Sequence, residues 1–114
     1  MTLFDYFIGL APAGETALIV KQIDTGKLHK DGKPRYTWPA YLPKHKRKGG
    51  ESWFLNTGSF IRDRMQDKPS ASVANCTHVL FMMLDDIGPK SKVPPLEPTA
   101  IVETSPGNYQ YWYA

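Results

Sequence analysis

The segment from Gly26 to Gly50 contains three prolines and four glycines, and this density limits the fold more than any other feature. Proline fixes φ and lacks a backbone N–H, while glycine loses much backbone entropy on ordering, so a helix cannot run through these residues. We therefore predict one long loop, or two loops around a short strand. With 114 residues, the chain is long enough for one domain with its own hydrophobic core.

The same segment carries most of the positive charge of the chain. Asp31 is the one acidic residue between Lys27 and Lys48. Cations release counterions from nucleic-acid phosphates and aromatic rings stack on bases, so this mixture favours nucleic-acid binding. A solvated basic loop is the alternative, and composition leaves both open. The cations are Lys27, Lys30, Lys33, Arg35, Lys44, Lys46, Arg47 and Lys48, of which Lys44, Lys46, Arg47 and Lys48 are our candidate nucleic-acid contacts.

Cysteine and histidine usage excludes several classes of protein. Cys76 is the single cysteine, which excludes an intramolecular disulfide framework and fits a reducing compartment. The histidines, His29, His45 and His78, do not show metal-ligand spacing. No apolar run reaches the ~20 residues of a membrane helix. We therefore expect a cytoplasmic domain.

Short segments between breaking residues predict an α+β fold in which strands outweigh helix. The predicted strands are 16–23, 52–56, 78–84, 99–104 and 109–113, with turns at 24–26, 56–58, 88–89 and 105–108 and an irregular linker through 94–98. A short helix is predicted at 60–65 with Ser59 as N-cap, and a further helical turn at 70–75. The apolar stretch 4–10 fits a helix or a strand.

Asp85 and Asp86 follow the unbroken apolar run 78–84, which we predict to be a strand buried on both faces. An ionised carboxylate is costly in apolar surroundings unless it is paired or binds a metal. Adjacent side chains of a regular strand point to opposite faces, so both carboxylates reach one ion only if the chain bulges here. Such a pair suits Mg²⁺ or Mn²⁺. Ordinary turn chemistry before Gly88 is the alternative.

The hairpin turn after strand 99–104 is more polar than a tight turn requires. Gly107 allows a phosphate to approach the backbone, and the neighbouring polar side chains offer hydrogen-bond donors. We therefore predict a nucleotide-phosphate contact at this turn. The candidate nucleotide-binding residues are Ser105, Gly107, Asn108 and Gln110.

Two motifs together resemble a known family. Leu-Asp-Asp-Ile-Gly at 84–88, followed by Glu-Thr-Ser-Pro-Gly-Asn-Tyr-Gln at 103–110, resembles the primase domain of plasmid RepB-type and phage replication proteins, which belong to the archaeo-eukaryotic primase superfamily. Segments 54–60 and 75–77 resemble the phage members, so the likeness runs from about residue 53 to the end. The first motif alone is unspecific, but the two at this spacing are fairly specific.

The resemblance implies an RRM-like antiparallel sheet with backing helices, and a primase-polymerase that makes primers by metal-dependent nucleotidyl transfer. Asp85 and Asp86 would be catalytic ligands of Mg²⁺ or Mn²⁺. Gln110 stands where the superfamily commonly has a histidine that contacts nucleotide phosphates. The family's third acidic motif would follow residue 114, so we expect residues 1–114 to be the incomplete N-terminal part of one catalytic domain, inactive alone.

The partners implied by the resemblance are a DNA template and primer, nucleoside triphosphates, and a replicative helicase domain in the same longer chain. A membrane partner is not expected, and the setting would be the cytoplasm of a bacterial host of a phage or mobile element. The alternative is a non-enzymatic module whose sheet reads single-stranded nucleic acid through aromatic rings. The rings considered for it are Trp53, Tyr109, Tyr111 and Trp112.

Overall fold

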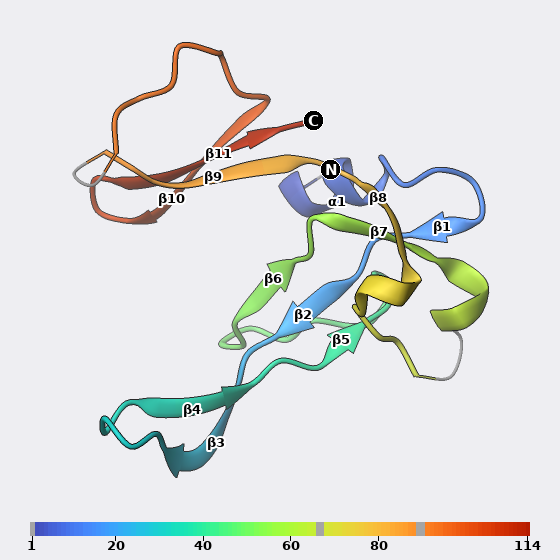
Figure 1. Ribbon diagram of the computed structural model, residues 1–114, viewed down its shortest axis with the longest axis horizontal. Coiled ribbons are helices and arrows are strands. Elements are labelled where there is room, and N and C mark those ends of the chain that lie inside the picture. The colour runs from blue at the N-terminus through green and yellow to red at the C-terminus, as the bar shows by residue number, and fades with distance from the viewer. Residues whose placement is uncertain (1, 66–67, 89–90) are drawn as a thin grey trace.

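The computed structural model describes residues 2–65, 68–88 and 91–114 (Figure 1). Its helical elements are α1 (Leu3–Ile8) and the 3₁₀ segments η1 (Arg62–Met65) and η2 (Val73–Asn75). The strands are β1 (Glu15–Thr16), β2 (Ile19–Lys21), β3 (Ile23–Leu28), β4 (Pro34–Thr37), β5 (Ala40–Tyr41), β6 (Trp53–Leu55), β7 (Gly58–Ile61), β8 (Cys76–Val79), β9 (Met82–Ile87), β10 (Ala100–Ser105) and β11 (Asn108–Tyr113). Strands outweigh helix, as predicted.

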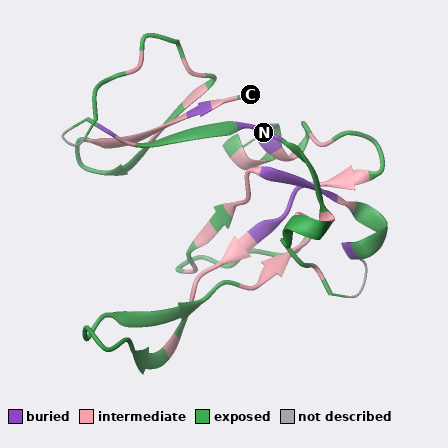
Figure 2. Cartoon of the chain, in the orientation of Figure 1, coloured by how far each residue is buried: buried purple, intermediate pink, exposed green. Residues whose placement is uncertain are grey.

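These strands pair antiparallel in four small sheets, ordered β1-β7-β8, β10-β11-β9, β5-β2-β6 and β3-β4. The β3–β4 hairpin projects from the rest of the chain and is exposed along most of its length (Figure 2). The Cα radius of gyration is 15.5 Å, above the ~13 Å of a compact chain of about this size. None of the helices among the described residues is long and apolar enough to cross a membrane.

The N-terminal stretch is a helix rather than a strand. Thr2 caps α1, because its Oγ1 accepts from the Asp5 amide at 3.2 Å and its own amide donates to the Asp5 carboxylate at 2.9 Å. Six residues make a marginal helix by themselves, so packing must hold it. Phe7 provides that packing, with ring centroids 4.7 Å from Phe81 and 5.1 Å from Trp112. This aromatic cluster joins α1 to the β10-β11-β9 sheet.

The helix predicted at 60–65 is wrong for its first two residues, Phe60 and Ile61. Residues 58–61 form β7, which pairs with both β1 and β8, and η1 follows as a 3₁₀ segment. Phe60 is 2% exposed in a core cluster with Leu18 and Met65. The sequence pattern also fits a helix, but pairing with strands on both sides of β7 gives the backbone N–H and C=O groups their hydrogen-bond partners while burying Phe60.

Ser59 is therefore not an N-cap but a buried strand residue. Its hydroxyl donates to Oε1 of Glu15 at 2.8 Å, and the hydroxyl of Thr77 donates to the same oxygen. His78 Nδ1 lies 2.9 Å from this Glu15 oxygen. The Thr77 and His78 hydrogen bonds lower the pKa of Glu15, because they favour its charged form. This contact joins β1 to β7 and β8.

The apolar run 78–84 is not one strand buried on both faces. Leu80 and Phe81 are buried between β8 and β9, but Val79 is 73% exposed and Met82 is 56% exposed. The physical reason is that the run crosses from one sheet to another: β8 and β9 are edge strands of different sheets, so the run is not one central strand with both faces covered. Asp85 and Asp86 consequently lie within an exposed edge strand.

The strand predicted at 16–23 is also divided, into β1, β2 and the start of β3, with Ala17 and Leu18 buried where the chain changes sheets. The turn predicted at 24–26 lies inside β3, where Gly26 takes φ 75° and its amide donates to Asp24 at 2.8 Å. The segment 26–50, predicted as one loop or two loops around a short strand, contains the end of β3, β4 and β5. Helix is excluded there, as predicted.

Other local predictions are confirmed. The turn at 56–58 forms, with the Gly58 amide donating to the Asn56 side chain at 2.8 Å. The helical turn within 70–75 is η2, and the final hairpin is β10–β11. Residues 92–98 contain neither helix nor strand. Pro89 of the predicted turn at 88–89 lies outside the described residues.

Candidate metal and nucleotide site

The strand that carries the two carboxylates has a bulge at the position where they stand. Leu84 pairs with Tyr111 and Ile87 with Tyr109, so Asp85 and Asp86 together oppose the single residue Gln110. Asp86 has φ 55°, a left-handed conformation that a non-glycine residue adopts at a cost of roughly 1–3 kcal/mol. The bulge that the sequence required for a shared ion is present.

Hydrogen bonds hold the bulge and tie it to the neighbouring hairpin. The Asp86 amide donates to Oδ1 of Asp85 at 2.8 Å, and Asn108 Nδ2 donates to Oδ1 of Asp86 at 3.3 Å. Asn108 Nδ2 also lies 3.1 Å from Thr104 Oγ1, which donates to the Asn108 carbonyl at 3.2 Å. Asp85 is exposed and Asp86 is half-buried. The two sequence motifs therefore meet through Asn108 and Asp86.

Gly88 allows the hairpin turn to close on the bulge. It has φ 128°, and a Cβ at this position would lie 2.5 Å from the Gly107 carbonyl oxygen. Gly107 has φ 78° in the two-residue connection between the paired residues Ser105 and Asn108. Only glycine accommodates both the dihedral and the contact at position 88. Position 88 therefore requires glycine for the Pro106-Gly107 turn to lie this close to the bulge.

The other candidate nucleotide-binding residues of the turn differ in exposure. Gln110 is half-buried, and its Oε1 accepts from the Trp112 indole at 3.2 Å. Ser105 and Gly107 are exposed, and the space where a Gly107 Cβ would point is open. The turn backbone is therefore accessible to a ligand, whereas the Gln110 side chain is directed along β11 toward Trp112.

A cavity of about 310 Å³ lies next to this face of the sheet. Gln110 and Thr104 are the polar residues of its wall, and the rest is apolar. A mostly apolar pocket with few polar groups is the usual form of a small-molecule site. The lining comes from α1, β6 and the β10-β11-β9 sheet: Leu3, Phe4, Trp53, Phe54, Leu55, Met83, Val102, Thr104, Gln110 and Trp112.

Glu103 and Tyr109 of the hairpin pair with each other and do not line this cavity. Tyr109 pairs with Glu103 across β10 and β11. The Glu103 carboxylate raises the pKa of the Tyr109 phenol, because it accepts a hydrogen bond from the protonated form and repels the phenolate. Glu103 therefore has the Tyr109 phenol as a hydrogen-bond partner.

The candidate nucleic-acid contacts lie in the exposed loop between β5 and β6. His45 anchors this loop, with its ring centroid 4.2 Å from Tyr41 and 5.7 Å from Trp53. The Arg47 guanidinium lies 5.2 Å from the ring centroid of Phe4, which lines the cavity. Arg47 therefore stands beside the candidate site.

Lys44 lies elsewhere, in a second cavity of about 300 Å³ shared with Leu42, Arg62 and Asp63. The Lys48 amide donates to Oε1 of Glu51 at 2.8 Å, which orders the end of the loop. Lys46 and Lys48 have exposed side chains. The four candidates thus share one loop, but the structure does not bring all of them to one point.

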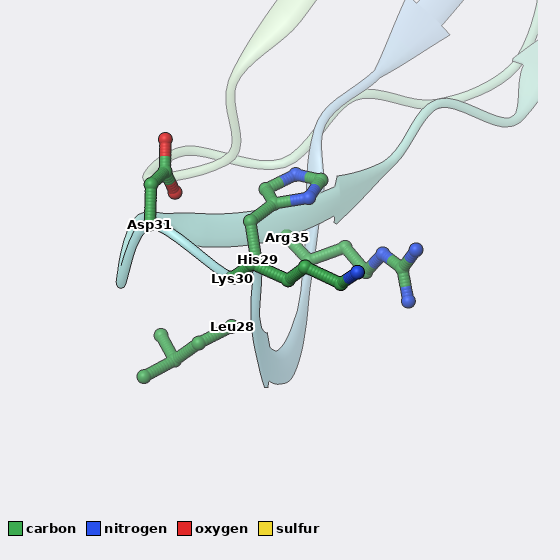
Figure 3. A pocket seen from close by; sticks show the side chains of 5 residues that line it. All are labelled: Leu28, His29, Lys30, Asp31 and Arg35. Carbon is green, nitrogen blue, oxygen red and sulfur yellow. The ribbon is translucent and has the colours of Figure 1, made fainter.

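The other cations of the basic segment lie on the β3–β4 hairpin. Lys30 and Arg35 line an open depression at its tip with Leu28, His29 and Asp31 (Figure 3). In this view the Lys30 and Arg35 side chains extend to the same side of the hairpin, and the Asp31 carboxylate points away. The basic segment is therefore two separate surfaces, one on the hairpin and one beside the cavity.

Sequence reasoning missed the contributions of Phe4 and Phe54 to the cavity wall and that of Thr104 to the Asn108 contact. Thr104 stands inside the 103–110 motif, so its position was a usable signal. Phe4 and Phe54 carry no such signal, because their place beside the sheet depends on how α1 and β6 pack.

The oxygen donors at the bulge fit a hard divalent cation. Within residues 2–65, 68–88 and 91–114, no three His, Cys, Asp or Glu side chains come together as a metal-holding group. Asp85 and Asp86 are the carboxylates at the bulge that could hold such an ion. Mg²⁺ typically takes one or two protein carboxylates and completes its octahedral shell with water and substrate phosphates. Two aspartates are therefore enough protein ligands for such an ion.

Comparison with known proteins identifies the chain. Neither the search of curated proteins nor the search of solved structures gave a significant match. The model of the family described as RepB DNA-primase N-terminal domain matches residues 42–114, which include β6 to β11, the bulge and the polar turn. Since this match covers more than half of the chain, the protein belongs to the RepB DNA-primase N-terminal domain family.

Proposed function

We propose that this chain carries the metal and nucleotide site of a DNA primase that extends primers by metal-dependent nucleotidyl transfer. Family membership supports a role in replication. The observation that supports the catalytic part is the β9 bulge, at which Asp85 and Asp86 together oppose Gln110 and Asp86 accepts a hydrogen bond from Asn108 of the polar turn. The proposal includes an RRM-like arrangement of this sheet with helices behind it.

Asp85 and Asp86 would hold Mg²⁺ or Mn²⁺, which when bound would neutralise triphosphate charge and activate the primer 3′-hydroxyl. Asn108 orients the Asp86 carboxylate through its side-chain amide. The exposed backbone at Gly107 and the Ser105 hydroxyl would donate to nucleotide phosphates. Gln110 can donate hydrogen bonds but carries no charge, so it would position a phosphate without neutralising it.

Lys44, Lys46, Arg47 and Lys48 would hold phosphates of the template or primer. Support comes from their exposure and from the position of Arg47 over Phe4 at the cavity wall. A strand bound along this loop would pass beside the cavity. Such contacts position a nucleic acid without reading its sequence.

Paramagnetic broadening by Mn²⁺ in NMR spectra tests the metal site directly. We expect the amide signals of residues 84–88 and of Asn108 to broaden first. Asp85→Asn should abolish this local effect, and the matched control Asp63→Asn, an exposed acid in η1, should leave it unchanged. Broadening that is spread over all acidic residues, or that persists in Asp85→Asn, would exclude the proposed site.

A second candidate function is a non-enzymatic module that binds single-stranded nucleic acid. One residue considered for it is not available: Trp112 is 6% exposed and stacks on Phe81 with ring centroids 4.8 Å apart. The observation that favours strand binding is a different set of aromatic rings, which lies outside the final sheet and is described next. The Mn²⁺ experiment separates this module from the primase.

A further inference from the structure

Three exposed aromatic rings form a row that the proposed catalytic site does not use. Tyr36 is 37% exposed, Trp38 is 53% exposed and Phe54 is 47% exposed. Their ring centroids are 6.1 Å apart for Tyr36 and Trp38, and 5.6 Å apart for Trp38 and Phe54. Large aromatic rings usually bury most of their surface. Three exposed rings in contact form a continuous apolar patch, and such patches mark binding surfaces.

Strand register explains why the three rings share one face. Val20 in β2 pairs with both Ala40 in β5 and Phe54 in β6, so these side chains lie on one side of the sheet. Trp38 and Tyr36 precede Ala40 by two and four residues, the spacing that keeps side chains on one face of an extended chain. The row therefore follows from the alternation of β4 and β5 and from the pairing of β2 with β6.

The row connects the projecting hairpin to the cavity. Tyr36 lies in β4, and Phe54, at the other end, is part of the cavity wall that includes Thr104 and Gln110. Tyr36 and Trp38 precede the residues matched by the family model, which begin at 42. The likeness to the family therefore says nothing about this end of the row.

Positive charge stands at both ends of the row. Arg47 lies over Phe4 at the cavity, and Lys30 and Arg35 extend from the hairpin tip, Arg35 from the face of β4 opposite to Tyr36 (Figure 3). Residues 23–38 contain four cations against two acids, Asp24 and Asp31. Aromatic faces between cations complement a flexible polyanion with planar groups. A neutral protein partner would not require the cations.

We propose that the row Tyr36–Trp38–Phe54 is a stacking surface for single-stranded nucleic acid. Bases stack on Tyr36 and Trp38, and the cations at the hairpin tip and at Arg47 contact the phosphates. The strand is thereby directed toward the cavity, whose wall includes Gln110, the residue opposite Asp85 and Asp86. Only this destination rests on the proposed function, because stacking on the row needs neither metal nor nucleotide. A duplex hides its base faces, so the surface selects single strands.

Fluorescence anisotropy of a labelled oligothymidylate of about 20 nucleotides, in buffer with EDTA, measures this binding. We expect Trp38→Ala to weaken the affinity of the full chain by about 5- to 100-fold. Trp38→Phe keeps a ring and should retain most of the affinity. Val73→Ala, which truncates a residue that is 91% exposed in η2 and outside the row, is the control and should bind like the wild type.

Three results would overturn the stacking surface. Trp38→Ala binding as tightly as the wild type, or a duplex of equal length binding as well as the single strand, would mean that phosphates alone are contacted. Concentration-dependent dimerisation in sedimentation velocity that Trp38→Ala abolishes would mean that a second copy covers the row. Circular dichroism of each variant confirms that the fold is intact.

The test distinguishes failure of this inference from failure of the primase site. Asp85→Asn/Asp86→Asn should bind the oligothymidylate like the wild type, because the row is independent of the carboxylates. Loss of strand binding in that double variant would contradict the stacking surface. If Mn²⁺ broadens the signals of residues 84–88 but Trp38→Ala binds the oligothymidylate as tightly as the wild type, the proposed primase site is supported and the stacking surface is disproved.

Discussion

Asn108 donates a hydrogen bond from Nδ2 to Oδ1 of Asp86 over 3.3 Å, and so connects two motifs that are 22 residues apart in the sequence. The contact exists because β9 bulges at the carboxylates and the Pro106-Gly107 turn of the adjacent hairpin comes back beside them. It couples the geometry of the candidate metal ligands to the polar turn, and the first two predictions concern this coupling.

Replacing Asn108 with alanine removes the donor to Asp86 and the contact with Thr104. We expect a decrease of about 1 kcal/mol in the free energy of unfolding, as for a typical protein hydrogen bond. Mn²⁺ should also broaden the signals of residues 84–88 less strongly at equal concentration. Urea denaturation and NMR measure the two effects. Ser105→Ala, an exposed neighbour in the same turn, should change both little, and an equal effect there would contradict a specific role of Asn108.

Gly88→Ala should disrupt the approach of the turn to the bulge, since the new Cβ would lie 2.5 Å from the Gly107 carbonyl. Strain from the positive φ and from the clash together should cost about 1–3 kcal/mol or more. Gly32→Ala is the matched control, because Gly32 has φ 83° but open space around a Cβ. Gly88→Ala must destabilise the fold more than Gly32→Ala; equal unfolding midpoints in urea would disprove the steric argument.

Glu51 should make the fold sensitive to acid. The ion pair with Lys21, the Lys48 amide and the Trp53 indole lower the pKa of Glu51 from 4.5 to about 2. Because the folded-state pKa is below the unfolded value, the stabilisation is complete above about pH 4.5 and disappears as the pH falls toward 2.

Urea midpoints of the wild type and of Glu51→Gln, compared from about pH 6 downward, measure this contribution. The difference between the two proteins should shrink as the pH falls below 4.5, the ordinary value for glutamate. A difference that stays constant over this range would mean that the Glu51 carboxylate contributes through packing rather than through its charge.

Removing the basic loop cations should flatten the salt dependence of strand binding. For a single strand, the slope of log K against log salt changes by about 0.7 for each phosphate that the protein no longer neutralises, so Lys46→Ala/Arg47→Ala/Lys48→Ala should reduce it by up to about 2. Lys68→Ala/Lys92→Ala removes exposed charges outside the loop and is the control. An unchanged slope in the triple variant would mean that the loop is only a solvated basic surface.

The parts of the fold that depend on local chemistry could be predicted from sequence. Pro106 and Gly107 specify a turn whatever surrounds them, and the β10–β11 hairpin forms where predicted. The exclusion of helix from 26–50 followed from proline and glycine alone. At the site, the chemistry of the adjacent carboxylates implied a bulge, and β9 has it at those two residues.

The parts that depend on long-range pairing could not be predicted. Phe60 fits an amphipathic helix as well as a strand, and its pairing partners in β1 and β8 are distant in sequence. An aromatic ring likewise carries no local sign of its burial. Trp112 is 6% exposed and Trp38 is 53% exposed, although both are tryptophans that follow or precede a tyrosine closely in sequence.

The sequence by itself determined that this is a strand-rich chain with a tight polar turn, a single basic segment and two adjacent carboxylates that need a bulge to reach one ion. Only the tertiary structure decided that Asn108 reaches Asp86, that Gly88 makes room for Gly107, and which aromatic rings are exposed. The physical reason is that turn and helix preferences act between near neighbours, whereas burial and strand pairing depend on which distant segments come to lie side by side.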